Sequence, residues 1–323
     1  MIRILPEGKL ARKEAKWFYV FIAPWIIGFL FFTGGPVIAS LYLSFTKYNV
    51  ASPPAWLGLQ NYTSMFQDRI FYKSLQVSAY YTALSVPLGI LLSLALAMLL
   101  NQKVPFLGVF RTLYYLPSLV TGVSVALLFQ WLLNPAFGIV NFVISWLVGP
   151  SGVIPLDIAG PGWFYDEAWV VPSHVILSMW AFGGSMLIYL SALQGVPTAL
   201  YEAATIDGAN VWQKFRNVTL PMISPVILFN FITGIIGAFR VFTQAYVISG
   251  TVGGGGQAFG SPNYASMFYV LYLYINAFRR YRFGFASAQA WVLFIVILVL
   301  TLLSLRVSRE AVYYESATEE DVL

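Results

Sequence analysis

The side chains that could carry out chemistry in this chain are few, and their types and spacing exclude the common kinds of enzyme site. There is no cysteine and only one histidine, His174, so zinc and iron–sulfur centres lack their usual ligands. Asp166 and Glu167 are adjacent, and in any regular structure adjacent side chains point apart, so they cannot act as a paired acid and base. We therefore expect no enzyme activity, no metal site and structural roles for these residues.

A glycine-rich stretch at residues 253–261 is the remaining candidate for phosphate chemistry. Gly255 and Gly260 have the separation of a P-loop, but Ser261 stands where that loop needs a lysine to hold the phosphates. We therefore expect no nucleotide site and no cofactor in this chain. A flexible loop, in which glycines relax the backbone, is the favoured interpretation.

One apolar stretch carries polar side chains that are costly to place in lipid. Asn230, Thr233 and Gly237 recur at helical spacing, as do Gly237, Arg240 and Gln244. Polar groups inside a membrane usually face protein or a water-filled cavity, so the four polar side chains could line a path for a solute. The alternative is a helix–helix hydrogen bond, with Arg240 extending to the outer membrane interface.

The elements that must position these groups are membrane-spanning helices. Of the 323 residues, 59% are hydrophobic and 10% are charged, whereas a soluble globular protein carries about 25% charged residues. Six windows have the roughly 20 apolar residues needed to cross the hydrocarbon core. They are residues 17–45, 75–100, 109–133, 173–193, 222–248 and 286–305. The sequence therefore predicts an all-α integral membrane protein, a single domain over residues 1–323, with no role in nucleic-acid binding.

The lysines and arginines orient these spans. Eleven cations lie on the side of the two termini and six on the opposite side, with Arg240 left out, and cationic loops stay preferentially in the cytoplasm. We therefore expect both termini, the loop 194–221 and the acidic tail 310–323 on the cytoplasmic side. The expected external loops are 46–74, 134–172 and 249–285.

A cationic cluster in the last of these loops opposes this orientation. Arg279, Arg280 and Arg282 lie on the side expected to be external, where such residues are disfavoured. Whether they contact lipid or a protein partner stays open. The first span raises a smaller question, because Gly34, Gly35 and Pro36 interrupt it and predict a tilt or a kink.

The loop 194–221 is the most polar internal segment of the chain, and local rules predict two short helices in it. Pro197 ends the fourth span, and Thr198 can cap a helix after it. Gly208 can end that helix. Asn210 can then cap a second helix, because Gln213 stands three residues on in capping-box spacing.

The surface of these two helices has two interpretations. Val211, Phe215 and Val218 fall on one face, with Trp212 beside it, which is typical of an amphipathic linker at the membrane surface. The second interpretation is a docking site, because Ala203 and Ala204 beside the carboxylate of Glu202 form a low surface that could enter a groove of a partner. Glu202, Ala203 and Ala204 are consecutive in the sequence.

The same loop resembles the EAA loop of permease subunits in binding-protein-dependent ABC importers. The resemblance covers Glu202-Ala203-Ala204, then Gly208, Val218 and Leu220-Pro221 at the family spacing. The family usually has isoleucine where Val218 stands. Three further stretches, residues 114–141, 193–210 and 283–294, resemble the carbohydrate-importing branch typified by the maltose and glycerol-3-phosphate permeases.

The resemblance implies a fold, a set of partners and a direction. It implies the type I importer permease fold, in the inner membrane of a bacterium or archaeon. The implied partners are a second, similar permease, two ATP-binding subunits inside and a solute-binding protein outside. The residues implied in coupling to the ATPase are Glu202, Ala203, Ala204, Gly208, Leu220 and Pro221.

Other transport functions remain as alternatives. A permease for peptides or amino acids would carry the same loop. A secondary transporter is disfavoured, because it usually shows repeated halves or membrane-embedded acids, and the six predicted spans contain no Asp or Glu.

Overall fold

The computed structural model describes residues 8–102, 105–148, 153–154, 160–252 and 259–308, and these form two compact units. The first unit comprises Met1–Gln67 and Tyr274–Leu293, and the second comprises Asp68–Leu273 and Phe294–Leu323. Several sequence features fall outside the described residues. They are Arg3, Lys103, Asp157, Arg309, the glycines 253–256 and the acidic tail 310–323.

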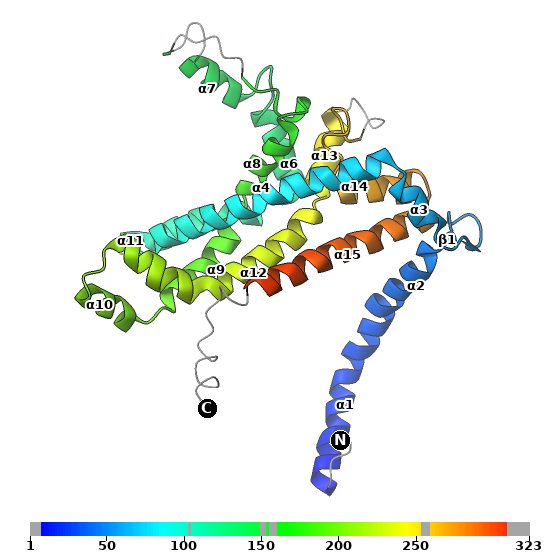
Figure 1. The fold of residues 1–323 in the computed structure, drawn as a ribbon, viewed down its shortest axis with the longest axis horizontal. Helices are drawn as coiled ribbons and strands as arrows, with labels where there is room; N and C mark the ends of the chain where they lie inside the picture. Colours follow the sequence, from blue (N-terminus) through cyan, green and yellow to red (C-terminus); the bar gives the residue numbers. More distant parts are fainter. Residues whose placement is uncertain (1–7, 103–104, 149–152, 155–159, 253–258, 309–323) are drawn as a thin grey trace. The chain divides into compact units, whose positions relative to one another are not determined.

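The first span is a continuous helix with a π-helical turn instead of a sharp kink. Helix α1 (Lys9–Phe29) passes through the π-turn η1 (Leu30–Gly34) into α2 (Gly35–Ser44) (Figure 1). The Gly35 N–H donates to the Leu30 carbonyl, five residues back. Pro36 has no N–H to continue the α-helical pattern, so the wider turn absorbs the missing bond.

The rest of the first unit is built around the end of α2. A two-stranded antiparallel sheet, β1 (Thr46–Lys47) and β2 (Ala55–Trp56), is followed by α3 (Gln60–Phe66). The π-turn η5 (Ile275–Arg279) and the start of α15 (Phe283–Ser308) belong to the same unit. The buried amide of Asn61 donates to the Ser44 and Thr46 carbonyls at 2.8 and 2.9 Å, which fixes the chain where it leaves the span.

Three helices pack together in the second unit (Figure 1). They are α4 (Arg69–Leu100), α9 (Gly183–Gln194) and α12 (Leu220–Phe239). Helix α4 begins earlier than the sequence predicts because the Asp68 carboxylate caps it, accepting from the Ile70 N–H at 2.8 Å. The hydrophobic faces of these helices form the core that holds the loop 194–221.

Two of the six predicted spans are strongly bent. The third consists of α5 (Leu107–Tyr115), the 3₁₀ turn η2 (Leu116–Leu119) and α6 (Gly122–Leu132), with a bend of 96°. The fourth consists of α8 (Val170–Met179) and α9, with a bend of 52°. Four further helices are long and apolar enough to cross a membrane, so the described residues supply six spans when each bent pair is one span, as predicted.

The remaining elements of the second unit lie in its connecting segments. They are α7 (Ile139–Val148), η3 (Trp163–Tyr165), α13 (Thr243–Val252) and α14 (Tyr269–Tyr274). Helix α7 differs from the loop expected at 134–172, because ten consecutive residues without a charge or a proline favour a helix over an irregular loop. His174 is buried between the rings of Phe164 and Phe268, at 5.1 and 5.0 Å between centroids, which is the structural role expected for it.

The start of α9 packs closely against the end of α5, and a glycine permits the approach. A Cβ at Gly183 would overlap the Tyr114 carbonyl oxygen and lie 2.8 Å from the Tyr115 Cα. We predict that Gly183→Ala destabilises the fold by about 1–3 kcal/mol, the usual cost of overpacking. Gly184→Ala is the matched control, since a Cβ there meets no atom within 4 Å. In detergent, the midpoint of thermal unfolding should be lower for Gly183→Ala than for the wild type and unchanged for Gly184→Ala. Equal midpoints for the two variants would contradict the close contact.

Candidate coupling surface and translocation cavity

The loop 194–221 contains the two short helices that its sequence predicts. Helix α10 (Thr198–Ile206) ends where Gly208 adopts a left-handed φ of +77°. The Ala209 N–H donates to the Ala204 carbonyl and the Gly208 N–H to the Thr205 carbonyl, at 2.9 and 3.1 Å. This pair of bonds is the Schellman motif, which satisfies the last carbonyls of a helix and confirms Gly208 as its end.

The start of α10 differs by one residue from the prediction. Thr198 is the first helical residue and not the cap, and Pro197 occupies the cap position without a side-chain hydrogen bond. Proline suits this place because its fixed φ, here −59°, leads directly into a helix.

The second helix, α11 (Val211–Lys214), begins with the predicted capping box. The Gln213 N–H donates to the Asn210 side chain at 2.9 Å, and the Asn210 N–H donates to the Gln213 side chain at 2.7 Å. A π-turn, η4 (Phe215–Thr219), then continues directly into α12, whose first two residues are Leu220 and Pro221. The second short helix is therefore a rigid extension of the fifth span.

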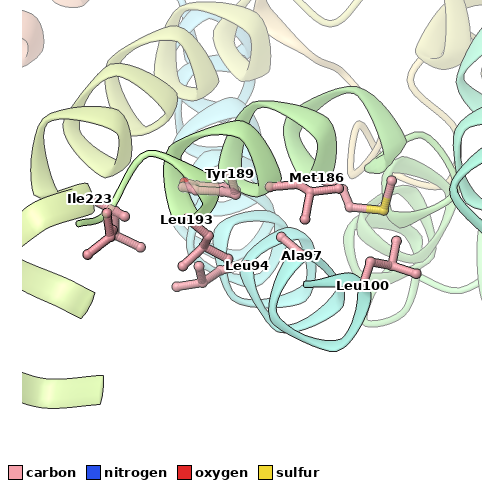
Figure 2. Close-up of a cluster of buried hydrophobic side chains, with 9 residues drawn as sticks. Leu94, Ala97, Leu100, Met186, Tyr189, Leu193 and Ile223 are labelled. Carbon is pink, nitrogen blue, oxygen red and sulfur yellow. The ribbon is translucent and has the colours of Figure 1, made fainter. Parts of the chain in front are cut away.

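A hydrophobic cluster anchors this loop to the membrane helices. Its buried members come from α4, α9, α12 and the short segment between α9 and α10, and Figure 2 draws them as sticks, with seven labelled. They are Leu94, Ala97, Leu100, Met186, Tyr189, Leu190, Leu193, Val196 and Ile223. Tyr201, Phe215 and Val218 of the loop pack against this cluster. Through Tyr201, Phe215 and Val218 the loop is therefore in contact with the packed core of three spans.

Two hydrogen bonds tie α10 to the segment after the glycine turn. The Tyr201 and Thr219 hydroxyls lie 2.9 Å apart, and the Lys214 ammonium donates to the Thr205 hydroxyl at 2.8 Å. The two short helices therefore behave as one body.

The outer side of the two short helices carries exposed apolar and acidic side chains. Glu202 and Ala203 are exposed and Ala204 is half-buried. Ile206 and Val211, on either side of the glycine turn, are 87% and 85% exposed. Exposed apolar side chains of this size, gathered at a turn between polar residues, are typical of a protein interface.

The apolar face predicted for the second helix is only partly correct. Phe215 and Val218 face the cluster, but Val211 and Trp212 do not, and Trp212 is 65% exposed. Val211 is the first residue of α11 and so lies beyond the end of the packed helices. Sequence reasoning did not single out Ile206, although a bulky residue two positions before a helix-ending glycine is a recognisable signal for an exposed tip.

We predict that Gly208→Ala weakens the turn by about 1–2 kcal/mol, the cost of a left-handed conformation for a residue with a Cβ. Gly208→Asn is the matched variant, because asparagine tolerates this conformation better. Hydrogen exchange of the amides in α10 should accelerate more in the alanine variant than in the asparagine variant. Equal protection in both and in the wild type would contradict the strained turn.

A cavity of about 430 Å³ lies inside the second unit, between α4, α9, α12 and α13. Its lining is rich in hydroxyl and amide groups and contains no charged side chain. The polar lining residues are Tyr81, Ser85, Ser93, Ser178, Ser185, Tyr189, Asn230 and Gln244. The Tyr189 hydroxyl is buried beside the cavity and has no hydrogen-bond partner among the described residues.

The cavity lies at two breaks in the membrane helices. Ala181 and Phe182, in the bend between α8 and α9, line it, and so does Val241, between α12 and α13. Non-helical backbone within a membrane is tolerated where it is buried in protein or lines a water-filled cavity. Two breaks at one polar cavity therefore indicate a place where solute or water enters.

The structure brings together two of the four side chains predicted to line a path. Asn230 and Gln244 line the cavity, whereas Thr233 and Arg240 are exposed and not part of its lining. Helix α12 ends at Phe239, so Arg240 is its cap and not a residue of a continuous helical face. The break rotates Gln244 into the cavity and leaves Arg240 outside it.

The serines of the cavity were missed by sequence reasoning. Ser85, Gly89 and Ser93 of α4 follow one another at intervals of four residues, so they form a small polar stripe on one helix face. That spacing within an apolar span is the signal that could have found them.

Comparison with known proteins places the chain in a family. Residues 85–310 match the model of the binding-protein-dependent transport system inner membrane component. The chain is 37% identical to the probable ABC transporter permease protein YesP of Bacillus subtilis, over 98% of this chain and 97% of that protein. It is 32% identical to the arabinooligosaccharides transport system permease protein AraP of the same species, over 90% and 88%.

The fold comparison agrees. A solved bacterial alginate ABC transporter, in complex with an alginate pentasaccharide-bound periplasmic protein, contains a chain with a TM-score of 0.76 and 25% identity. The match covers 93% of this chain and 96% of that one. On sequence and fold together, the chain belongs to the inner membrane components of binding-protein-dependent transport systems, the multi-pass permeases of ABC transporters.

Proposed function

We propose that this chain forms part of the translocation path for a carbohydrate in an ATP-driven importer. The observation that carries the proposal is the uncharged cavity rich in hydroxyl and amide groups at two helix breaks. Such groups donate to and accept from sugar hydroxyls without the cost of burying an unpaired charge. The names of relatives support the same substrate class, since they are transport permeases for arabinooligosaccharides, lactose and starch degradation products.

A permease for peptides or amino acids is the second candidate. Free ammonium and carboxylate groups of such solutes need charged or strongly polar partners once they leave water. The cavity lining contains no Lys, Arg, Asp or Glu, which favours a solute without charged termini.

The energy for transport comes, in this proposal, from separate ATP-binding subunits. The exposed face of α10 and α11, with Glu202, Ala203 and Ala204, enters a groove of such a subunit, and Glu202 pairs there with a cation. Gly208 forms the bend, and Leu220 and Pro221 transmit the movement into the fifth span. In this proposal ATP binds to those subunits and not to this chain.

The proposed assembly lies in the cytoplasmic membrane of a bacterium or archaeon. It contains a second similar permease, two ATP-binding subunits inside and a solute-binding protein outside, with both termini of this chain in the cytoplasm. The side chains of α1 are exposed over most of their length, including Trp17, Phe21 and Trp25, so they are available to lipid or to the second permease.

Uptake by the assembled transporter in proteoliposomes tests the substrate class. We expect ATP-dependent accumulation of a neutral oligosaccharide in the presence of the solute-binding protein, and no accumulation of a dipeptide of similar size. Accumulation of the dipeptide in preference to every oligosaccharide tried would contradict the proposal.

A further inference from the structure

A polar pocket of about 480 Å³ lies within the first unit and has no part in the cavity or the coupling surface. It is formed by the segment that follows α2 and by the segment that precedes α15. Three of its lining residues are cations, Lys47, Arg280 and Arg282, and none is an acid. Asn49, Gln60 and Ser64 also line it and carry amides or hydroxyls that can donate hydrogen bonds.

A close backbone approach brings the two segments together. A Cβ at Gly284 would overlap the Thr46 carbonyl oxygen and lie 3.1 Å from the Leu43 carbonyl oxygen. The Gly284 N–H donates to the Tyr48 carbonyl at 3.2 Å. Because only glycine permits this approach, the cations of the two segments are held around one pocket and are not independent surface charges.

The arginine side chains are also held in place. An Arg280 guanidinium N–H donates to the Asn276 side chain at 3.2 Å, and the Arg282 guanidinium stacks over the Phe285 ring at 4.4 Å. All three cations keep an exposed surface. Guanidinium groups that are already oriented lose less entropy when they bind a carboxylate, which they match in geometry.

The count of predicted spans indicates on which side of the membrane the pocket lies relative to the coupling surface. The pocket segments follow the first span and precede the sixth, whereas the loop 194–221 follows the fourth. When each bent pair is one span, an odd number of spans lies between these positions, so the predicted topology has the two sites on opposite sides of the membrane. Where the coupling surface meets ATPase subunits inside, the pocket faces the external solute-binding protein.

We propose that this pocket receives an acidic side chain of the solute-binding protein and so orients it on the permease. The inference rests on the proposed function, which supplies that partner. A carboxylate fits the surplus of three cations and the amide and hydroxyl donors around them. The proposal also gives a reason for Arg280 and Arg282 on a side of the membrane where cations are disfavoured.

The test is a titration of the assembled transporter in proteoliposomes with solute-loaded binding protein. The stimulated ATPase activity is measured at each concentration of binding protein. Lys47→Glu and Arg280→Glu should each raise the half-saturating concentration of binding protein by about tenfold or more, as expected for reversal of a docking charge. The Lys47→Glu variant is expected to fold, because Lys47 is an exposed residue of a short strand, so it keeps the test valid if Arg280→Glu misfolds. Arg69→Glu is the matched control: the same charge change on an exposed residue of the same side, not part of the pocket lining.

Raised salt should increase the half-saturating concentration for the wild type and leave the two variants less affected, because a charge pair is screened. Unchanged half-saturation in both variants, with a stimulated wild type, overturns the inference alone. The variants should also be compared in phosphatidylglycerol and phosphatidylcholine vesicles at saturating binding protein. If their loss of ATPase activity depends on the phosphatidylglycerol content, the pocket binds lipid phosphate and the inference is overturned. A wild type that no binding protein stimulates overturns the proposed function itself.

Discussion

Replacing Glu202 by lysine is expected to separate ATP hydrolysis from transport while the chain stays folded in the membrane. Glu202 is exposed on α10, and none of the described residues hydrogen-bonds its carboxylate, so its substitution removes no internal contact. In the proposed complex the carboxylate meets a cation of the ATPase. Loss of such a desolvated pair costs about 2–5 kcal/mol, and a lysine adds repulsion. ATP-driven uptake in proteoliposomes should therefore fall to background.

Asp207→Lys is the control for this prediction. It makes the same charge change at another exposed position of the loop 194–221, but Asp207 caps the C-terminal end of α10, where a cation is tolerated by the helix dipole. We expect a smaller loss of uptake in this variant. Wild-type uptake by the Glu202→Lys transporter would show that the assignment of the coupling residue is wrong.

Filling the cavity at Gly89 is expected to abolish solute passage without disturbing the helices around it. Gly89 lines the cavity, and a Cβ built there meets no atom within 4 Å. A phenylalanine at this position therefore extends into the open volume instead of into the backbone of a neighbour. We predict that Gly89→Phe loses more than about 90% of uptake, since the ring occupies the space that a sugar needs.

Gly28→Phe provides the comparison for the blocked cavity. Gly28 also lies in a membrane helix and a Cβ there meets no atom within 4 Å, but it belongs to α1 and not to the cavity. Its uptake should remain near that of the wild type. Normal uptake by Gly89→Phe, in a variant whose thermal unfolding is unchanged, would show that solute does not pass through this cavity.

Much of the coupling surface could be predicted from the sequence because local rules determine it. Asn210 and Gln213 stand at capping-box spacing, and Gly208 is the residue of that stretch that turns left-handed at the lowest cost. The exposure of Val211 and Ile206 could not be predicted in the same way. It depends on where α4, α9 and α12 end, which is a property of packing and not of local sequence.

The cavity was less predictable than the loop. Asn230 and Gln244 were identified as polar residues in an apolar span, and both line it. Arg240 attracted attention because it is charged, but a helix break at this residue changes which side chains face inward. The break at residues 240–242 contains no glycine or proline, so no local signal in the sequence predicts it.

Orientation in the membrane stays a prediction from charge. The five cations before the first span, including Lys13 and Lys16, argue for cytoplasmic termini, whereas the arginines at 279, 280 and 282 argue the other way. The pocket that contains Arg280 and Arg282 offers a functional reason for the exception, so its titration bears on the orientation too.

The central claim, that this chain is a solute path driven by separate ATPase subunits, is tested most directly by purification from native membranes. The subunits that accompany the tagged wild-type chain and the Glu202→Lys variant should be identified by mass spectrometry. The account predicts a second permease and an ATP-binding subunit with the wild type, and loss of the ATP-binding subunit with the variant. Recovery of the chain alone, still able to carry solute in proteoliposomes, would contradict it and would make the loop 194–221 a membrane-surface linker.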